Sequence, residues 1–280
     1  MDRRSLLIGG AAAGSAVLSG RWSVANDAKP TNEPWLRKTL KQNMVRLPGN
    51  NPTDLTDLGA FGERCRAAKS SGFDGYELSV PLGGGDSNIS AAELARVASD
   101  EGIVLDGTVG GYHWKIRHTD PDEGIRADAG QRLKQGIRQT MELGGDTMLL
   151  VPGHGKDGDA KTVYDHATRA IEKALPHAEE HKVHIVVENV WNHFLYDHEG
   201  GSDQTADQHL AFVKQFDSRW VGMQFDIGNH WKYGNPADWI KTLDRYIFKL
   251  DIKGFSREKS GFTDVTVGEL PWNEFYLALR

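Results

Sequence analysis

The sequence predicts a (β/α)8 barrel, an α/β fold, that stops before its eighth strand. Seven short runs of apolar and β-branched residues alternate with longer segments that carry apolar residues at helical spacing. Several short runs are apolar on both faces, as buried parallel strands are. No G-x-G-x-x-G or Walker loop follows the first run, which disfavours an open nucleotide-binding sheet. The alternation therefore favours the closed barrel over a doubly wound sheet.

The expected strands are MVRL, GYELSV, IVLDGTV, DTMLLVPG, HIVVENV, VGMQFDIG and IFKLDIKG, which end near Leu47, Val80, Gly110, Pro152, Val190, Gly228 and Gly254. Helices are expected between them over residues 54–71, 91–101, 122–143, 160–181, 204–216 and 236–245. Glycine follows several of these segments, as it commonly does at helix C-termini. The residues from Trp272 onward predict the start of a further helix, so the sequence ends where an eighth strand is expected to follow.

The first 25 residues have the pattern of an export signal. Arg3 and Arg4 precede a short apolar run over residues 6–18, and Ser23, Val24 and Ala25 suit cleavage by a signal peptidase. The run is too short and too weakly apolar to span a bilayer. We therefore expect a Tat-type signal peptide at 1–25, an extension at 26–42 and the barrel at 43–280. The protein would be periplasmic or extracellular, with no stable membrane span after cleavage. An uncleaved N-terminal anchor is the alternative.

Composition restricts the classes of function. The charged and hydrophobic fractions are those of a globular domain with a sizeable core, and the net charge of −6 disfavours a nucleic acid partner. The single cysteine, Cys65, cannot form an internal disulfide. Homo-oligomerisation is left open by these observations.

Two carboxylates stand out at the expected strand ends, where barrels of this kind build their sites. Glu188 lies in HIVVENV and Asp226 in VGMQFDIGN, and burying either one unpaired would be costly. A shared divalent cation would resolve this cost, and carboxylate ligands suit Mn²⁺, Mg²⁺, Co²⁺ or Zn²⁺. The alternative is that each carboxylate pairs with a buried arginine or lysine, and Lys253 is a candidate for such a partner.

Other polar residues near the strand ends are candidate substrate contacts. They are Glu77, His113, Trp114, His154, Asn229, His230 and Lys253. An aromatic ring such as that of Trp114 offers a flat face on which a ligand could stack. The run of His177, His181 and His184 has the residue types of a metal-binding tract. The favoured interpretation is solvent-facing helix and turn, because the run precedes a strand and so lies at the end of the barrel opposite the expected site.

The stretches GFDGYELSV, ELGGDTMLLVPG, HIVVENVWN, VGMQFDIGN and KLDIKGF, in this order, resemble the sugar phosphate isomerase/epimerase family of xylose isomerase-like barrels. The resemblance implies that Glu188 and Asp226 bind a divalent metal. It also implies a third ligand at Asp251, where the family usually has histidine. The family's fourth ligand is a glutamate on the eighth strand, and no residue of this sequence can be assigned to it.

The resemblance implies proton transfer next to a carbonyl, with Glu188 moving the proton. A metal-dependent isomerase or epimerase is therefore expected. A small carbohydrate substrate that is not phosphorylated, or a keto-sugar, fits both the export signal and the missing phosphate loop. Three alternatives remain: a lyase that carries out β-elimination on 3-keto-glycosides, a non-catalytic sugar-binding barrel, and an apurinic-site endonuclease. The last is disfavoured by the negative charge, the export signal and the few matching histidines.

Overall fold

The computed structural model describes residues 16–19, 36–85 and 88–280 of the chain. Most of the predicted signal peptide and part of the predicted extension lie outside the described residues. Among the described helices, none combines the length and apolarity that crossing a membrane requires.

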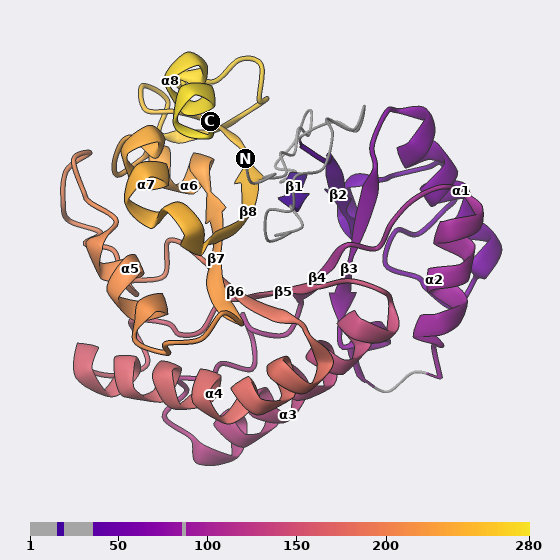
Figure 1. Cartoon of the computed structure of the whole chain (residues 1–280), viewed down its shortest axis with the longest axis horizontal. Helices are drawn as coiled ribbons and strands as arrows, with labels where there is room; N and C mark the ends of the chain where they lie inside the picture. The colour runs from indigo at the N-terminus through magenta and orange to yellow at the C-terminus, as the bar shows by residue number, and fades with distance from the viewer. Residues whose placement is uncertain (1–15, 20–35, 86–87) are drawn as a thin grey trace, which may run out of the picture.

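Seven parallel strands, β2 to β8, follow one another around a closed barrel (Figure 1). They are β2 (Thr39–Lys41), β3 (Gly75–Val80), β4 (Gly107–Gly110), β5 (Thr147–Leu150), β6 (His184–Glu188), β7 (Val221–Asp226) and β8 (Ile247–Ile252). A short strand, β1 (Ala16–Ser19), pairs antiparallel with both β2 and β8 and closes the ring. The predicted barrel is confirmed, and the described residues include no eighth parallel strand.

Helices surround the strands on the outside (Figure 1). They are α1 (Leu58–Ser70), α2 (Ala91–Asp100), α3 (Glu123–Glu142), α4 (Ala160–His181), α5 (Asp207–Lys214), α6 (Ile227–Trp231), α7 (Pro236–Leu243) and α8 (Trp272–Ala278). Short 3-10 turns, η1 (Gln42–Met44), η2 (Leu82–Gly85) and η3 (Asp244–Tyr246), lie beside the strands. Six helices begin at a side chain that accepts a hydrogen bond from a first-turn backbone N–H, namely Asp57, Ser90, Asp122, Asp159, Asp226 and Asn235.

The predicted position of the first strand is wrong. MVRL, at residues 44–47, belongs to the turn η1 and the loop after it, whereas β2 lies just before it and pairs with β3. The barrel therefore begins before the predicted boundary at residue 43. The physical reason is that the interior of the barrel is polar here. Thr39 is fully buried and Lys41 pairs with Asp251 on β8, so this strand lacks an apolar signature.

A buried ionic cluster forms a layer inside the barrel below the strand ends. Lys249 on β8 donates a hydrogen bond to Glu77 on β3, and its Nζ lies 3.9 Å from Asp106 Oδ2. Thr39 Oγ1 donates to Asp106 at 3.0 Å. Burial raises the pKa of Glu77 to about 7, although the nearby Lys249 charge counteracts the rise. This layer links non-adjacent strands and supports the residues above it.

Replacing Lys249 with methionine should destabilise the fold by about 3–5 kcal/mol, because the Glu77 and Asp106 carboxylates would remain buried without their cation. Urea unfolding followed by circular dichroism measures this loss. The double variant Lys249→Met, Glu77→Gln should recover part of it, since the carboxylate in direct contact is removed as well. Equal stability of wild type and Lys249→Met would contradict the assignment of this lysine as the central cation.

Candidate functional site

Three carboxylates meet at the carboxyl ends of three adjacent strands. Glu188 ends β6, Asp226 ends β7 and Asp251 lies near the end of β8, directly opposite Asp226 in the strand register. One oxygen from each lies within 4.8 Å of the others. The side chains of Asp226 and Asp251 are fully buried, and that of Glu188 is 9% exposed. The predicted convergence of these three residues is therefore present in the structure.

Two lysines neutralise part of this carboxylate cluster. The Lys253 ammonium pairs with Asp226 Oδ2 and lies 3.8 Å from Glu188 Oε1. The Lys41 ammonium, which comes from β2, donates to Asp251 Oδ2. The alternative in which the carboxylates pair with lysines is thus also present, and Lys253 is one of the partners as anticipated. Asp251 Oδ1 remains buried without a hydrogen-bond partner.

Backbone and amide groups hold Asp226 in place. Its Oδ1 accepts a hydrogen bond from the backbone N–H of Asn229 at 2.7 Å, which caps the short helix α6. The Asn189 side chain accepts from the Asp226 backbone N–H at 2.8 Å and donates to the Asp226 carbonyl at 2.9 Å. Asn229 also donates through its side chain to the Asn189 carbonyl at 3.0 Å. These bonds join the ends of β6 and β7, so the carboxylates they carry are held in a fixed relation.

The pKa values in the cluster are shifted by burial and by the neighbouring charges. Burial raises the pKa of Asp226 to about 7, with Lys253 opposing the rise and Asp251 and Glu188 adding to it. Burial also raises the pKa of Glu188, against the charges of Lys41 and Lys253. For Lys253 itself, burial alone would lower the pKa, but the surrounding carboxylates outweigh it and the pKa is raised. The cluster therefore binds a proton more readily than isolated carboxylates would.

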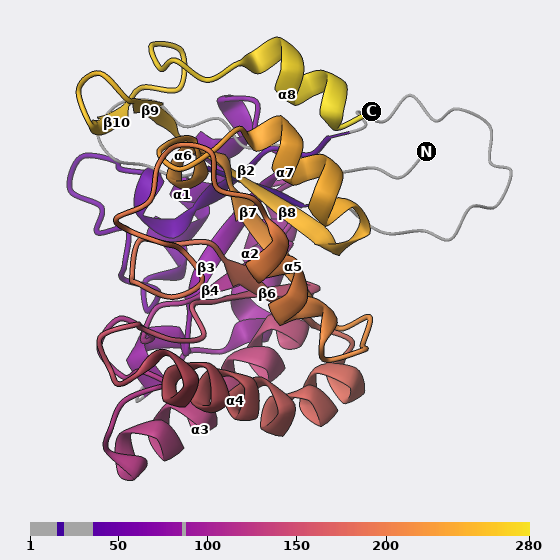
Figure 2. The same ribbon diagram turned by 90° about the vertical axis from the view of Figure 1, so that its left-hand side faces the viewer.

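An aromatic wall, made of Trp191, Phe255 and Phe262, stands beside Lys253. Phe255 and Phe262 come from the hairpin of β9 (Gly254–Ser256) and β10 (Gly261–Thr263). The rings of Trp191 and Phe262 stack with centroids 5.1 Å apart, and Lys253 Nζ lies 5.6 Å from the Phe262 ring. Phe262 is 44% exposed, so part of its ring is open to solvent. Figure 2 shows the hairpin beside α6, which starts where β7 ends.

The structure does not bring two of the predicted substrate contacts to the carboxylate cluster. Glu77 lies in the buried layer below, where it pairs with Lys249. The His230 side chain is fully buried between aromatic rings, with its centroid 3.7 Å from that of Trp239 on α7 and its Nδ1 bonded to the Tyr196 hydroxyl at 3.1 Å. Its burial lowers its pKa well below the usual value. Strand-end position alone does not tell which way a side chain points, and the contact of Glu77 and His230 with a substrate stays a prediction.

The remaining predicted contacts lie around the strand ends with different exposure. His113 is buried, and its Nδ1 accepts from the backbone N–H of Val151 at 3.4 Å; burial lowers its pKa to about 3. Trp114 is 52% exposed, with its ring against that of His113. His154 is partly exposed and accepts from the backbone N–H of Lys156 through Nδ1. Their contact with a substrate stays a prediction.

Sequence reasoning missed Lys41 and the aromatic wall. Lys41 falls in the predicted extension, residues 26–42, because the first strand was predicted at MVRL instead of at Thr39–Lys41. Phe262 lies beyond the last predicted strand. The signal that could have found it is the Gly-Phe pair that occurs twice in KGFSREKSGF, since this segment folds into the hairpin.

The chain belongs to the Xylose isomerase-like TIM barrel family, whose profile matches residues 65–280. A curated relative, the uncharacterized protein MJ1311 of Methanocaldococcus jannaschii, is 24% identical over 153 residues, which are 53% of this chain and 50% of that protein. This chain therefore spans about half the length of that relative.

Three similar solved structures are described as sugar epimerases. The 3-keto-D-glucoside 4-epimerase YcjR from E. coli superposes with a TM-score of 0.66 at 16% identity, covering 87% of each chain. An L-ribulose 3-epimerase also superposes with a TM-score of 0.66, at 20% identity, covering 86% of this chain and 76% of its own. A D-psicose 3-epimerase crystallised with D-fructose superposes with a TM-score of 0.63 at 20% identity, covering 79% of this chain and 75% of its own. At these identities the likeness establishes the shared barrel fold.

Lys253→Met should destabilise the protein by roughly 3 kcal/mol at pH 7.5, because Asp226 and Glu188 lose their nearest cation. The loss should shrink at pH 5. The folded-state pKa of Asp226, about 7, lies above its ordinary value of 3.8, so protonation favours the folded state as pH falls between these values. At pH 5 Asp226 is largely protonated and needs the ammonium less.

Urea unfolding at both pH values measures the effect of Lys253→Met. Lys232→Met is the matched control, since the Lys232 ammonium lies over the rings of Trp191 and Tyr233 rather than beside a carboxylate. A loss of stability from Lys253→Met that is equal at both pH values would contradict the pairing with Asp226.

Proposed function

We propose that this protein is a divalent-metal-dependent sugar isomerase or epimerase that transfers a proton at the carbon next to a carbonyl. The observation that carries the proposal is the meeting of Glu188, Asp226 and Asp251 at the carboxyl ends of β6, β7 and β8. In (β/α)8 barrels this end of the strands carries the chemistry. The descriptions of the solved neighbours as sugar epimerases support the same reaction class.

The donor set fits a hard divalent cation such as Mn²⁺ or Mg²⁺. Three carboxylate oxygens face one another, and such ligands suit these ions. The buried and unpartnered Oδ1 of Asp251 is a further acceptor that a cation would satisfy. Glu188, Asp226 and Asp251 would hold the ion, and Lys253 would have to leave Asp226 to make room. When bound, the ion would supply Lewis-acid polarisation of a substrate carbonyl.

Glu188 is the residue proposed to move the proton. It is the most exposed of the three carboxylates, and burial raises its pKa toward the range in which a carboxylate is an effective general base. It would take the proton from the carbon next to the carbonyl, while the C–H electron pair forms the enediolate double bond and charge moves to the carbonyl oxygen. Return of a proton to the same carbon from the opposite face gives the epimer. Return to the former carbonyl carbon gives the isomer, with the hydroxyl proton of the first carbon passing to the former carbonyl oxygen so that a carbonyl forms at the first carbon.

The proposed substrate is a non-phosphorylated sugar or a keto-sugar. The exposed ring of Phe262 beside Lys253 offers a surface on which a sugar could stack. The sequence contains no Walker-type phosphate loop of the pattern G-x-x-x-x-G-K-[ST]. Export through a Tat-type signal, which is proposed from the pattern of the first 25 residues, would also favour a substrate outside the cytoplasm.

A β-eliminating lyase on 3-keto-glycosides is the second candidate. The observation that favours it is the similarity to a 3-keto-D-glucoside 4-epimerase over 87% of the chain. Both reactions begin with the same proton abstraction, and they differ in whether the intermediate is reprotonated or expels its β-substituent. A non-catalytic sugar-binding barrel is the third, because Lys41 and Lys253 can neutralise the cluster without a metal.

Incubating Mn²⁺-loaded protein with 3-keto-glucosides and with free ketoses in D₂O distinguishes these candidates. We expect deuterium at the carbon next to the carbonyl, measured by mass spectrometry and NMR. Release of the aglycone would identify the lyase. Sugar binding without either outcome, in protein that holds no stoichiometric metal, would indicate a binding protein and refute the proposed enzyme.

Glu188→Gln should lower the rate of deuterium incorporation by about 10²–10⁴-fold, the contribution expected of a general base. Glu199→Gln is the matched control, because Glu199 is exposed in the loop that follows the same strand. Thermal unfolding should show that both variants are folded. A Glu188→Gln variant that exchanges deuterium at the wild-type rate would rule out Glu188 as the base.

Phe262→Ala should raise KM by about tenfold with a smaller change in kcat, since a lost stacking contact of roughly 1–1.5 kcal/mol weakens binding before and during reaction alike. Steady-state kinetics on the substrate found in the D₂O experiment measures this. Tyr276→Ala, which removes an exposed aromatic ring on α8, should leave KM unchanged. A fall in kcat at constant KM would argue against a stacking role for Phe262.

A further inference from the structure

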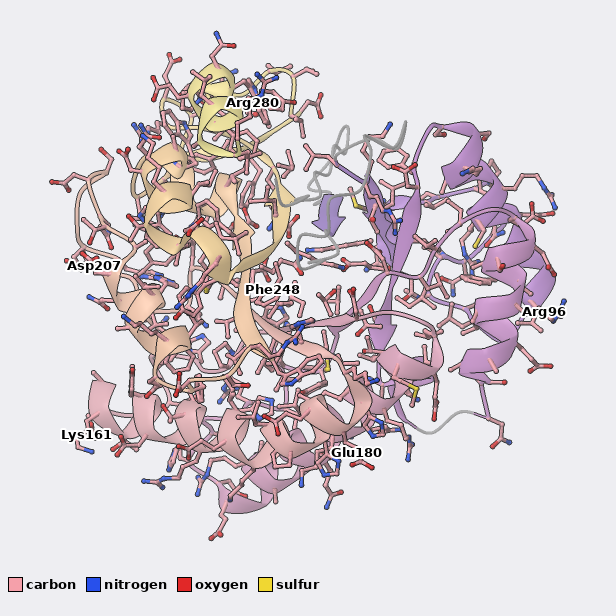
Figure 3. All side chains as sticks on the ribbon, in the orientation of Figure 1. Arg96, Lys161, Glu180, Asp207, Phe248 and Arg280 are labelled. Carbon is pink, nitrogen blue, oxygen red and sulfur yellow. The ribbon has the colours of Figure 1, made fainter. Side chains whose placement is uncertain are left out.

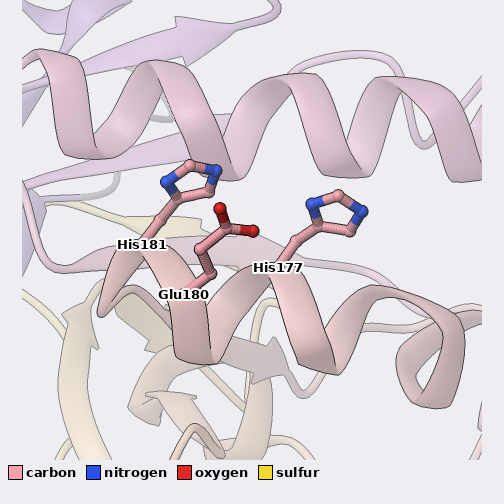
Figure 4. Close-up of side chains that lie close together, drawn as sticks. All are labelled: His177, Glu180 and His181. Carbon is pink, nitrogen blue, oxygen red and sulfur yellow. The ribbon is translucent and has the colours of Figure 1, made fainter.

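A second group of metal-ligating side chains lies at the end of α4. His177, Glu180 and His181 are spaced i, i+3 and i+4, so they share one face of the helix. Figure 4 shows the three side chains projecting from the same side of α4. One ligand atom from each lies within 4.8 Å of the others, and the two imidazole rings are nearly parallel, at 20°.

This imidazole group is separate from the carboxylate cluster. α4 ends at His181, and β6 begins three residues later at His184 and runs to Glu188. The imidazole group therefore lies toward the start of the strand and the carboxylate cluster lies at its end. Figure 3 places Glu180 on the outer ring of helices. The proposed reaction at the carboxylate cluster does not use it.

His184 does not belong to the imidazole group, although it follows closely in sequence. Its ring packs against Trp220 and Phe248, with centroids 4.8 and 4.4 Å away, and its Nδ1 lies 3.0 Å from the Asp146 carbonyl oxygen. By contrast, within the described part of the chain no ion pair or hydrogen bond engages the side chains of His177, Glu180 or His181. Their ligand atoms are accessible, since His177 and His181 are partly exposed and Glu180 is exposed.

We propose that His177, Glu180 and His181 bind a borderline transition-metal ion, Zn²⁺ foremost, as a second metal site of this protein. Two imidazoles and one carboxylate are the donors that Zn²⁺, Cu²⁺ and Ni²⁺ prefer, and water would complete a tetrahedral zinc site. Ligand atoms about 2.0–2.2 Å from one ion are closer together than in this structure, so the exposed side chains rotate slightly on binding. The all-oxygen carboxylate cluster favours harder ions. The two sites would therefore differ in the metal they prefer, with a borderline ion on α4 and a hard ion at the carboxylate cluster.

The site is tested with untagged full-length protein, by titrating Zn²⁺ against a chromophoric chelator at pH 7.5 and by recording the Tm with and without Zn²⁺. The double variant His177→Ala, His181→Ala should lose this binding and the rise in Tm that accompanies it. Glu180→Gln should weaken binding by roughly tenfold or more, because even the loss of an outer-shell partner commonly costs that much. Glu179→Gln, the neighbouring exposed carboxylate, should bind Zn²⁺ as the wild type does.

Two further variants separate this site from the others in the chain. Asp226→Asn should retain Zn²⁺ binding on α4, so failure of the proposed enzymatic function leaves this inference standing. His193→Ala removes one ring of the other adjacent histidine pair, whose centroids are 4.1 Å apart, and should also retain it. Loss of Zn²⁺ binding in either of these variants, or its persistence in the His177, His181 double variant, would overturn the proposal.

Discussion

The structure depends on how the barrel interior neutralises buried negative charge. Glu188, Asp226 and Asp251 end three neighbouring strands, where their mutual repulsion and their burial both oppose ionisation. Lys253 and Lys41 offset two of the three charges from opposite sides. Lower in the barrel, Lys249 does the same for Glu77 and Asp106. The interior is therefore arranged as stacked ionic layers, and the apolar packing lies mainly between the strands and the helices.

This arrangement explains why the fold was easier to predict than the site. Helix and strand positions follow from apolar periodicity on the outer faces of the strands, which face the helices. GYELSV and residues 160–181 match β3 and α4 residue for residue. The inward faces have no such periodicity. The strand Thr39–Lys41 is polar, so apolar periodicity predicts the neighbouring and more apolar MVRL instead. Lys41 is therefore absent from the predicted site.

Glu188 and Asp226 were predictable because a charged residue buried in an apolar strand needs a partner. Asp251 was expected as a third ligand only from the resemblance to the family. Which partner each carboxylate takes was not predictable, since a lysine ammonium and a metal cation both neutralise a buried carboxylate. His230 shows a different limit. His230 follows a strand end, but it lies on the short helix α6 and its side chain packs against Trp239 instead of pointing toward Asp226. A rotation of this kind depends on tertiary packing and leaves no trace in residue spacing.

The pairing of Asp226 with Lys253 has a consequence for the apoprotein. In small metal-dependent domains the ligands repel one another without the ion, and folding waits for metal. Here the Lys41 and Lys253 ammonium groups already offset two of the three carboxylate charges, so the cluster is largely balanced before any cation binds. Under the proposed function, a cation would enter by displacing Lys253 from Asp226, so its affinity would be the difference between two interactions. The proposed metal would then be acquired or exchanged at a site that is already balanced, according to what the surroundings offer.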